Sequence, residues 1–93
     1  RMRPDLCFLG ACGADADAGV TAFNYDEAEF KRSIAGASKA VIVAVTSDKL
    51  GTAAPFGVLA TGLLQHLVLE ADADAVHVAA FQRLGVQVLR ARA

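Results

Sequence analysis

The chain has 93 residues, of which 55% are apolar and 20 are alanine, so it is expected to fold as one domain with a core of mainly small side chains. Its net charge is −1, from 9 basic and 10 acidic residues, and this balance excludes the concentrated basic face that nucleic-acid binding normally needs. Polar residues within the longest uncharged stretch of the second half exclude a membrane span, and two cysteines without a pairing pattern favour a reducing, cytoplasmic compartment.

The first predicted strand is followed by a loop of small residues. Residues 6–9 (LCFL) form a continuous apolar run that ends in glycine, which is typical of a strand buried on both faces. Residues 10–19 (GACGADADAG) contain only glycine, alanine, cysteine and aspartate. This composition predicts a loop in which several positions are free to take a positive φ.

A helix and a second strand are predicted next. Asn24 and Glu27 have the spacing of a capping box, which predicts a helix from about residue 25 to residue 37. An apolar stripe at helical spacing is expected on its core-facing side: Phe30, Ile34 and Ala37. Residues 40–45 (AVIVAV) are β-branched, too short for a helix and too apolar for an exposed strand, so they predict a central, parallel strand.

The middle of the chain is harder to assign. Residues 46–54 are predicted to form a polar turn. Residues 56–69 are ambiguous, because three of their leucines fit one face of a helix whereas residues 66–69 alone fit a strand. The preferred interpretation is a short helical turn near residues 60–65 and a strand at 66–69.

The last predicted elements are a helix and a strand. Asp72 or Asp74 can cap the helix, and Gly85 ends it as a residue beyond the last turn would. Residues 86–89 are predicted to form the final strand. The expected apolar stripe of the helix consists of Ala75, Val78, Phe81 and Leu84.

The alternation of strands and helices predicts an α/β fold. The order β-α-β-β-α-β implies a single domain with a mostly parallel sheet and helices on both of its faces. In open parallel sheets, ligands bind beyond the carboxyl ends of the strands. Two loops leave those ends, at residues 10–21 and 46–54, and the site is expected there.

Neither loop carries a decisive motif. The first can present backbone N–H groups to an anion, but it lacks the glycine spacing of nucleotide-binding loops and is more simply a flexible connection. Thr46, Ser47 and Lys49 suit a phosphate or sugar hydroxyls, and equally an ordinary polar turn. Cys7 is expected in the core and Cys12 in a structural role. No metal-ligand spacing or Ser-His-Asp arrangement is present, so no metal, cofactor or catalytic residue is predicted.

Three segments in register resemble the DeoR-type bacterial transcriptional regulators, within their C-terminal effector domain. The segments are DLCFLGACGADADAGVT, DEAEFKRSI and AVIVAVTSDKLG, and the resemblance covers roughly residues 5–88. In that family a strand ends in FLG-x-x-G and leads to a G-[LV]-T step, a helix carries E-x-x-K-R, and a further strand ends in D-x-S-K-[FL]-G. The resemblance implies a fold related to sugar-phosphate isomerases and CoA transferases. It also implies a non-enzymatic, homo-oligomeric sensor that binds a phosphorylated sugar and controls operator binding by a separate N-terminal helix-turn-helix.

The resemblance also implies a set of ligand-binding residues. Carried over by position, these are Gly10, Cys12, Gly13, Asp15, Thr21, Lys31 and Lys49. Lys49 is expected to contact the phosphate or a ring hydroxyl, and Lys31 to lie near the same crevice. The helix-turn-helix and the Gly-x-Thr phosphate loop of the family would both precede residue 1, and Thr46 stands where the family turn has aspartate. The chain is therefore expected to be a partial effector domain, residues 1–93, without DNA affinity of its own.

Two alternatives remain at this point. The chain can be a fragment of a sugar-phosphate isomerase on the same scaffold, in which case a carboxylate must act as general base and Asp15 is the candidate. It can also be an α/β domain that has lost its ligand function.

Overall fold

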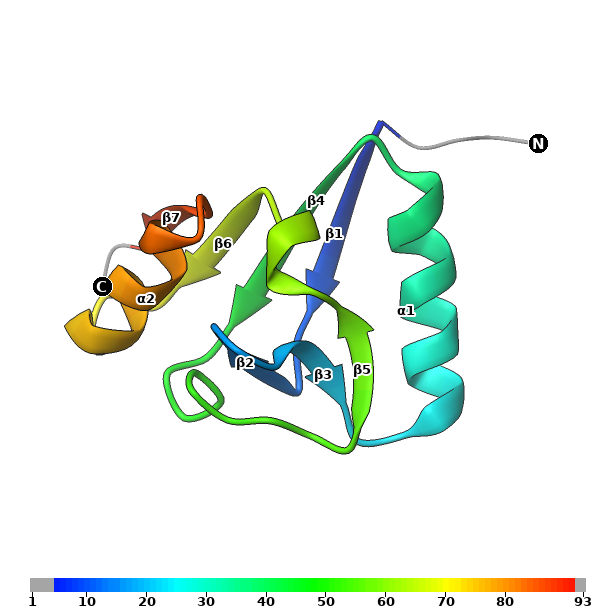
Figure 1. The fold of residues 1–93 in the computed structure, drawn as a ribbon, viewed down its shortest axis with the longest axis horizontal. Helices are drawn as coiled ribbons and strands as arrows, with labels where there is room; N and C mark the ends of the chain where they lie inside the picture. Colours follow the sequence, from blue (N-terminus) through cyan, green and yellow to red (C-terminus); the bar gives the residue numbers. More distant parts are fainter. Residues whose placement is uncertain (1–4, 92–93) are drawn as a thin grey trace.

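Four parallel strands form the larger of two sheets in the computed structural model, which describes residues 5–91 (Figure 1). In spatial order they are β1 (Leu6–Gly10), β4 (Ala40–Val45), β6 (His66–Leu69) and β7 (Gln87–Arg90). Each strand pairs in parallel with its neighbour, so that Phe8 lies opposite Ile42 and Ile42 lies opposite His66. The predicted parallel α/β fold is confirmed, and the last strand begins one residue later than expected.

A second, antiparallel sheet occupies part of the region predicted to be loop. It consists of β2 (Gly13–Asp15), β3 (Gly19–Ala22) and β5 (Phe56–Leu59). The prediction of a loop over residues 10–19 was therefore wrong at residues 10, 13–15 and 19, which lie in strands, and right at 11–12 and 16–18; the strand at 56–59 was missed. β2 and β3 are three and four residues long and rich in small side chains, so they have little intrinsic strand signal and form only because tertiary packing buries them.

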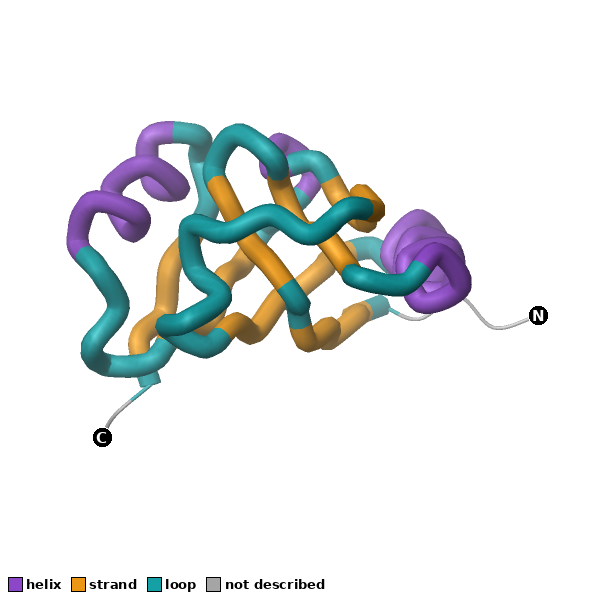
Figure 2. Tube along the Cα trace, turned by 90° about the horizontal axis from the view of Figure 1, so that it is seen from below, coloured by secondary structure: helices purple, strands orange, loops and turns teal. Residues whose placement is uncertain are grey.

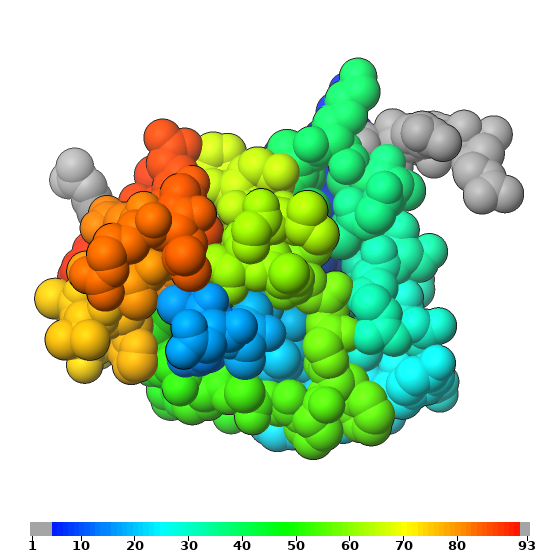
Figure 3. Space-filling view, in the orientation of Figure 1, coloured from blue at the N-terminus to red at the C-terminus, as the bar shows by residue number. Residues whose placement is uncertain are grey.

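The second sheet lies in front of the large sheet in the view of Figure 1. In the space-filling view, the segment around β2 reaches the surface between the residues of the C-terminal helix and those that follow β5 (Figure 3). A side-chain hydrogen bond fixes this position, because the Thr61 hydroxyl donates to the carbonyl oxygen of Ala16 at 2.8 Å. Thr61 begins η1 (Thr61–Leu63), a short 3-10 helix that matches the predicted helical turn.

The first helix, α1 (Tyr25–Ala37), begins as the capping pattern predicts but buries a different face. The Asn24 side chain accepts a hydrogen bond from the backbone N–H of Glu27 at 3.1 Å. The predicted stripe was right only at Ile34, which is partly buried and packs against the core, since Phe30 is 66% exposed, Ala37 is exposed, and the buried residues are Ala28 and Ala35. Alanines at the two buried positions let the helix approach β5 and β3 closely.

The second helix, α2 (Ala75–Arg83), is capped by Asp74, whose carboxylate accepts from the backbone N–H of Val76 at 2.8 Å. Of the predicted stripe, Val78 and Phe81 are buried, whereas the residues at its two ends are exposed. Gly85 follows the helix with φ +89°, as expected of a glycine that ends a helix.

The large sheet is covered on one face only. A single core cluster joins residues of β1, β4 and β6 to buried residues of both helices and of the second sheet. Figure 2 shows the second sheet and α2 on the same side of the large sheet. The residues that alternate with the core-facing ones form the other surface, here called the open face: Leu6, Phe8, Gly10, Ala40, Ile42, Ala44, His66, Val68, Gln87 and Leu89.

Helices on both faces, and a first strand buried on both faces, were therefore wrong predictions. The reason is the order of the strands. Along the chain, the strands take their places across the sheet in one direction, in the order β1, β4, β6 and β7. Because each connection between neighbouring strands is a right-handed crossover, all three connections pass over the same face of the sheet. Helices on both faces require a reversal of strand order, and residues 5–91 contain none.

Candidate functional site

A crevice of about 450 Å³ lies at the carboxyl ends of the parallel strands, the edge at which ligands of such sheets bind. Its residues come from the ends of all four strands and from α1: Gly10, Ala11, Cys12, Lys31, Ala44, Val45, Thr46, Val68, Leu69, Glu70 and Ala91. The floor is mostly apolar, and the charged groups on its wall are one lysine and one glutamate. Such a site suits a small molecule with both a carbon skeleton and a charged group.

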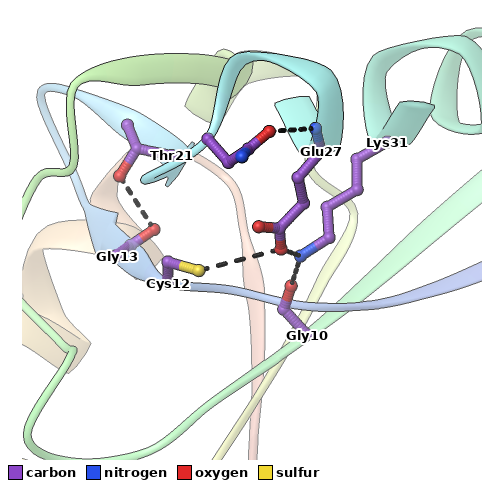
Figure 4. A network of polar contacts seen from close by, with 7 residues as sticks. Gly10, Cys12, Gly13, Thr21, Glu27 and Lys31 are labelled. Carbon is purple, nitrogen blue, oxygen red and sulfur yellow. Dashed lines mark hydrogen bonds and ion pairs between the residues drawn. The ribbon is translucent and has the colours of Figure 1, made fainter. Parts of the chain in front are cut away.

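Lys31 is held in place at the crevice by two acceptors (Figure 4). Its ammonium donates to the carbonyl oxygen of Gly10 at 2.6 Å and lies 2.9 Å from the Glu27 carboxylate, one turn earlier on α1. The Cys12 thiol donates to the same carboxylate at 3.8 Å. The hydrogen bond and positive charge of Lys31 hold the pKa of Glu27 below its usual value of 4.5. These contacts fix the Lys31 ammonium next to the first strand end.

The helix start explains why these groups meet. The cap at Asn24 sets the first turn of α1, which places Glu27 at its beginning and Lys31 one turn further on, both facing the end of β1. Glycine at position 10 contributes its carbonyl oxygen without a side chain that would occupy the crevice. Local capping chemistry and the first strand end thus build one wall of the site together.

The second strand-end turn is fixed by the strand beside it. The backbone N–H of Ser47 donates to the Glu70 carboxylate at 2.6 Å, and its hydroxyl donates to the Asp72 carboxylate at 2.6 Å. A hydrogen bond from Thr46 holds the pKa of the Asp48 carboxyl below its usual value. These contacts keep the turn rigid and place Thr46 on the crevice wall.

The structure separates the seven residues that were expected to bind ligand. Gly10, Cys12 and Lys31 line the crevice. Gly13, Asp15, Thr21 and Lys49 lie outside its lining.

Thr21 and Gly13 make contacts that join β2, β3 and the loop before β5. The buried Thr21 hydroxyl donates to the Gly13 carbonyl at 3.3 Å and accepts from the backbone N–H of Ala54 at 2.8 Å. A Cβ at position 13 would lie 2.7 Å from the Thr21 hydroxyl oxygen and 2.8 Å from the carbonyl oxygen of Thr52, so this packing requires glycine.

The side chains of Asp15 and Lys49 also contact neighbouring protein groups. The Asp15 carboxylate accepts from the backbone N–H groups of Asp17 and Ala18, both at 3.0 Å, and so closes the turn between β2 and β3. The Lys49 ammonium lies 5.7 Å from the centre of the Phe23 ring, in a cation–π contact.

Several crevice residues were not predicted from sequence. Val68, Leu69 and Glu70 end the strand that was ambiguous, and Ala91 follows the last strand. These residues follow from the rule that parallel strands present their carboxyl ends at one edge of the sheet. From the sequence, this rule was applied to the loops after two strands; applied to all four strands, it identifies them. Among residues 5–91, no group of three His, Cys, Asp or Glu side chains is placed to hold a metal ion. Among residues 5–91, no helix has the length and apolar character needed to cross a membrane.

Comparison with protein families gives one match. Residues 1–71, which include both strand-end turns and α1, match the model described as the DeoR C-terminal sensor domain. Comparison with curated proteins found no match.

Proposed function

The chain belongs to the DeoR C-terminal sensor domain family, and we propose that it is the part of a DeoR-type regulator that binds a phosphorylated sugar in the crevice at the carboxyl ends of its parallel strands. The family match makes it the effector domain of a DeoR-type regulator. The observation that carries the choice of ligand is the fixed Lys31 ammonium at the rim of an apolar-floored crevice of about 450 Å³.

The chemistry of the crevice supports a phosphosugar. An ammonium is a strong donor to phosphate oxygens, and the apolar floor at Ala44 and Val68 offers a surface for the carbon skeleton of a sugar. The hydroxyl of Thr46 and the carboxylate of Glu70 are partners for sugar hydroxyls. Of the two lysines carried over from the family, Lys31 is the stronger candidate for the phosphate, because Lys49 lies outside the crevice lining and against Phe23.

Effector binding regulates only if the ligand prefers one state of the whole regulator over another. We expect DNA to be contacted through a separate helix-turn-helix, and the regulator to be a cytoplasmic homo-oligomer. The isomerase alternative needs Asp15 as general base, but this carboxylate caps its own turn and does not line the crevice. We therefore propose no catalytic step.

The test is calorimetric titration of phosphosugars, and of the same sugars without phosphate, into the full-length regulator. Lys31→Met should weaken phosphosugar binding by about tenfold to a hundredfold, because one charge-assisted hydrogen bond contributes roughly 1.5–3 kcal/mol. Lys39→Met is the matched control, since this lysine lies at the opposite edge of the sheet with its side chain 81% exposed. Equal weakening by the two substitutions, or an unchanged affinity in Lys31→Met, contradicts the proposal.

Glu27 provides a second test of opposite sign. Its carboxylate competes with an incoming phosphate for the Lys31 ammonium, from which it is 2.9 Å away. Glu27→Gln removes the competing charge and keeps the side-chain shape, so phosphosugars should bind more tightly to this variant. The unphosphorylated sugars should show no such gain. A loss of phosphosugar affinity in Glu27→Gln would mean that the carboxylate serves the ligand directly.

A further inference from the structure

We propose that the crevice selects sugars that carry a single phosphate, and that Glu70 determines this selectivity by repelling a second phosphate at the far end of the ligand. The inference rests on the proposed binding of phosphosugars and names the class of phosphosugar that the same crevice accepts. It depends on where the two charged side chains of the lining lie, on what holds each of them, and on the strand that separates them.

The two charged residues of the lining stand at different strand ends. The Lys31 ammonium donates to the carbonyl oxygen of Gly10, the last residue of β1, at 2.6 Å. Glu70 directly follows Leu69, the last residue of β6. In the sheet, β4 lies between these two strands (Figure 1). Because neighbouring strands are about 4.8 Å apart, the two strand ends are separated by roughly 10 Å. The crevice therefore has a basic end at β1 and an acidic end at β6.

Glu70 is held in place by the turn that follows β4. One oxygen of its carboxylate accepts a hydrogen bond from the backbone N–H of Ser47 at 2.6 Å. The Ser47 hydroxyl donates to the carboxylate of Asp72 at 2.6 Å, so a second carboxylate lies on the same turn. Backbone N–H groups in turns are common donors to phosphate oxygens, and here a carboxylate of the protein already accepts from one. A phosphate at this end would meet the repulsion of Glu70 and would find that donor occupied.

Two basic residues belong to the segments on either side of β6, but neither lines the crevice. Arg90, at the end of β7, donates to the carbonyl oxygen of Ala71 at 3.1 Å and lies outside the lining. Lys49, on the turn after β4, lies against the Phe23 ring and is also outside it. In the part of the chain that the structure describes, the basic side chain of the lining is therefore Lys31 alone.

This arrangement of charges accepts a hydroxyl at the acidic end and rejects an anion there. A sugar hydroxyl donates a hydrogen bond to a carboxylate, so a sugar with its phosphate at Lys31 and a hydroxyl at Glu70 satisfies both ends. A second phosphate at Glu70 would place like charges together without a cation between them. Repulsion of this kind discriminates against a ligand without improving the binding of the correct one.

The test is calorimetric titration of the full-length regulator with matched pairs of ligands. Each sugar monophosphate that binds is compared with the same sugar bearing a second phosphate at the other end of its carbon chain, beginning with fructose 6-phosphate and fructose 1,6-bisphosphate. The wild-type regulator should bind the bisphosphate at least about tenfold more weakly than the monophosphate.

Glu70→Gln tests whether the charge of the side chain, and not its size, causes the difference. The amide oxygen of glutamine can still accept from the backbone N–H of Ser47, so the turn should be retained, and thermal melts check this. The variant should bind the bisphosphate at least about tenfold more tightly than the wild type does. It should bind the monophosphate no more tightly, because an amide oxygen is a weaker acceptor than a carboxylate. Asp5→Asn is the matched control, since it removes the same charge at the opposite edge of the sheet, where the Asp5 side chain is 85% exposed.

Three results would overturn the inference and leave the proposed function standing. The first is a bisphosphate that binds the wild type as tightly as the monophosphate does. The second is a Glu70→Gln variant that gains no affinity for the bisphosphate, which would assign the discrimination to the size of the crevice. The third is an equal gain in Asp5→Asn, which would assign it to the net charge of the protein. If no phosphosugar of either kind binds, the proposed function is contradicted and this inference with it.

Discussion

Replacing Thr21 by valine distinguishes a structural from a ligand-binding role for a residue that the family resemblance assigns to the ligand. Thr21 is 5% exposed, and its hydroxyl bridges the Gly13 carbonyl at 3.3 Å and the Ala54 backbone N–H at 2.8 Å. Valine has nearly the same shape but no hydroxyl. The substitution therefore removes these two hydrogen bonds from buried backbone groups and creates almost no cavity.

The expected loss follows from those two groups. A buried polar group left unpaired costs about 1–3 kcal/mol, so Thr21→Val should lower the free energy of unfolding by roughly 2–3 kcal/mol. For a domain of this size, about 1 kcal/mol corresponds to 4–8 °C, so the melting temperature should fall by roughly 10 °C or more. Since domains are stable by only about 5–15 kcal/mol, a loss of this size is easily measured.

The assay is thermal and urea unfolding, with Thr52→Val as the matched control. Thr52 is exposed and donates its hydroxyl to the Lys49 carbonyl at 2.7 Å, so the same chemical change there should cost no more than about 0.5 kcal/mol. If Thr21→Val melts together with Thr52→Val, the bridging role is wrong. If it instead retains its stability and loses phosphosugar affinity, Thr21 acts on the ligand as the resemblance implies.

Three further outcomes test the packing and the charges. The pKa of Glu27 is lowered by Lys31, so this pair stabilises the fold above pH 4.5, the ordinary pKa, and ceases to do so as the pH falls through the lowered pKa. Glu27→Gln should therefore reduce the melting temperature at neutral pH and make no difference in acid. A difference in melting temperature that stays constant across a pH series would contradict this. Phe81→Ala removes a fully buried ring and should lower the free energy of unfolding in urea by about 3–5 kcal/mol, whereas Phe30→Ala on the exposed side of α1 should lower it little. Similar losses in the two variants would mean that the core is misplaced. Gly19 has φ +80°, and a Cβ there would lie 2.3 Å from the carbonyl oxygen of Leu59 in β5. Gly19→Ala should therefore lower the free energy of unfolding by more than about 1 kcal/mol. An unchanged melting curve would refute the close approach of β3 to β5.

Residues close together in sequence determined the long elements and part of the site. The run at 40–45 is too short and too β-branched for a helix, and it forms the central strand β4. Asn24 and Glu27 predicted the start of α1, and that start brings Lys31 to the end of β1, where it was expected. The parallel α/β fold followed from the order of these elements, because right-handed crossovers leave few alternatives. Capping and periodicity are local, so one sequence is sufficient to recognise them.

Only the tertiary structure decided which faces are buried and which small residues pair. Residues 13–15 and 19–22 become strands because the loop before β5 and the Thr21 hydroxyl bring them together, and no spacing in the sequence encodes those partners. In α1 the buried residues are Ala28 and Ala35, and of the expected stripe only Ile34 packs against the core, since a short helix–sheet distance favours small side chains at the contact. Phe8 lies on an open face although its run of residues is apolar throughout. Burial depends on which side every crossover takes, and that is a property of the whole chain.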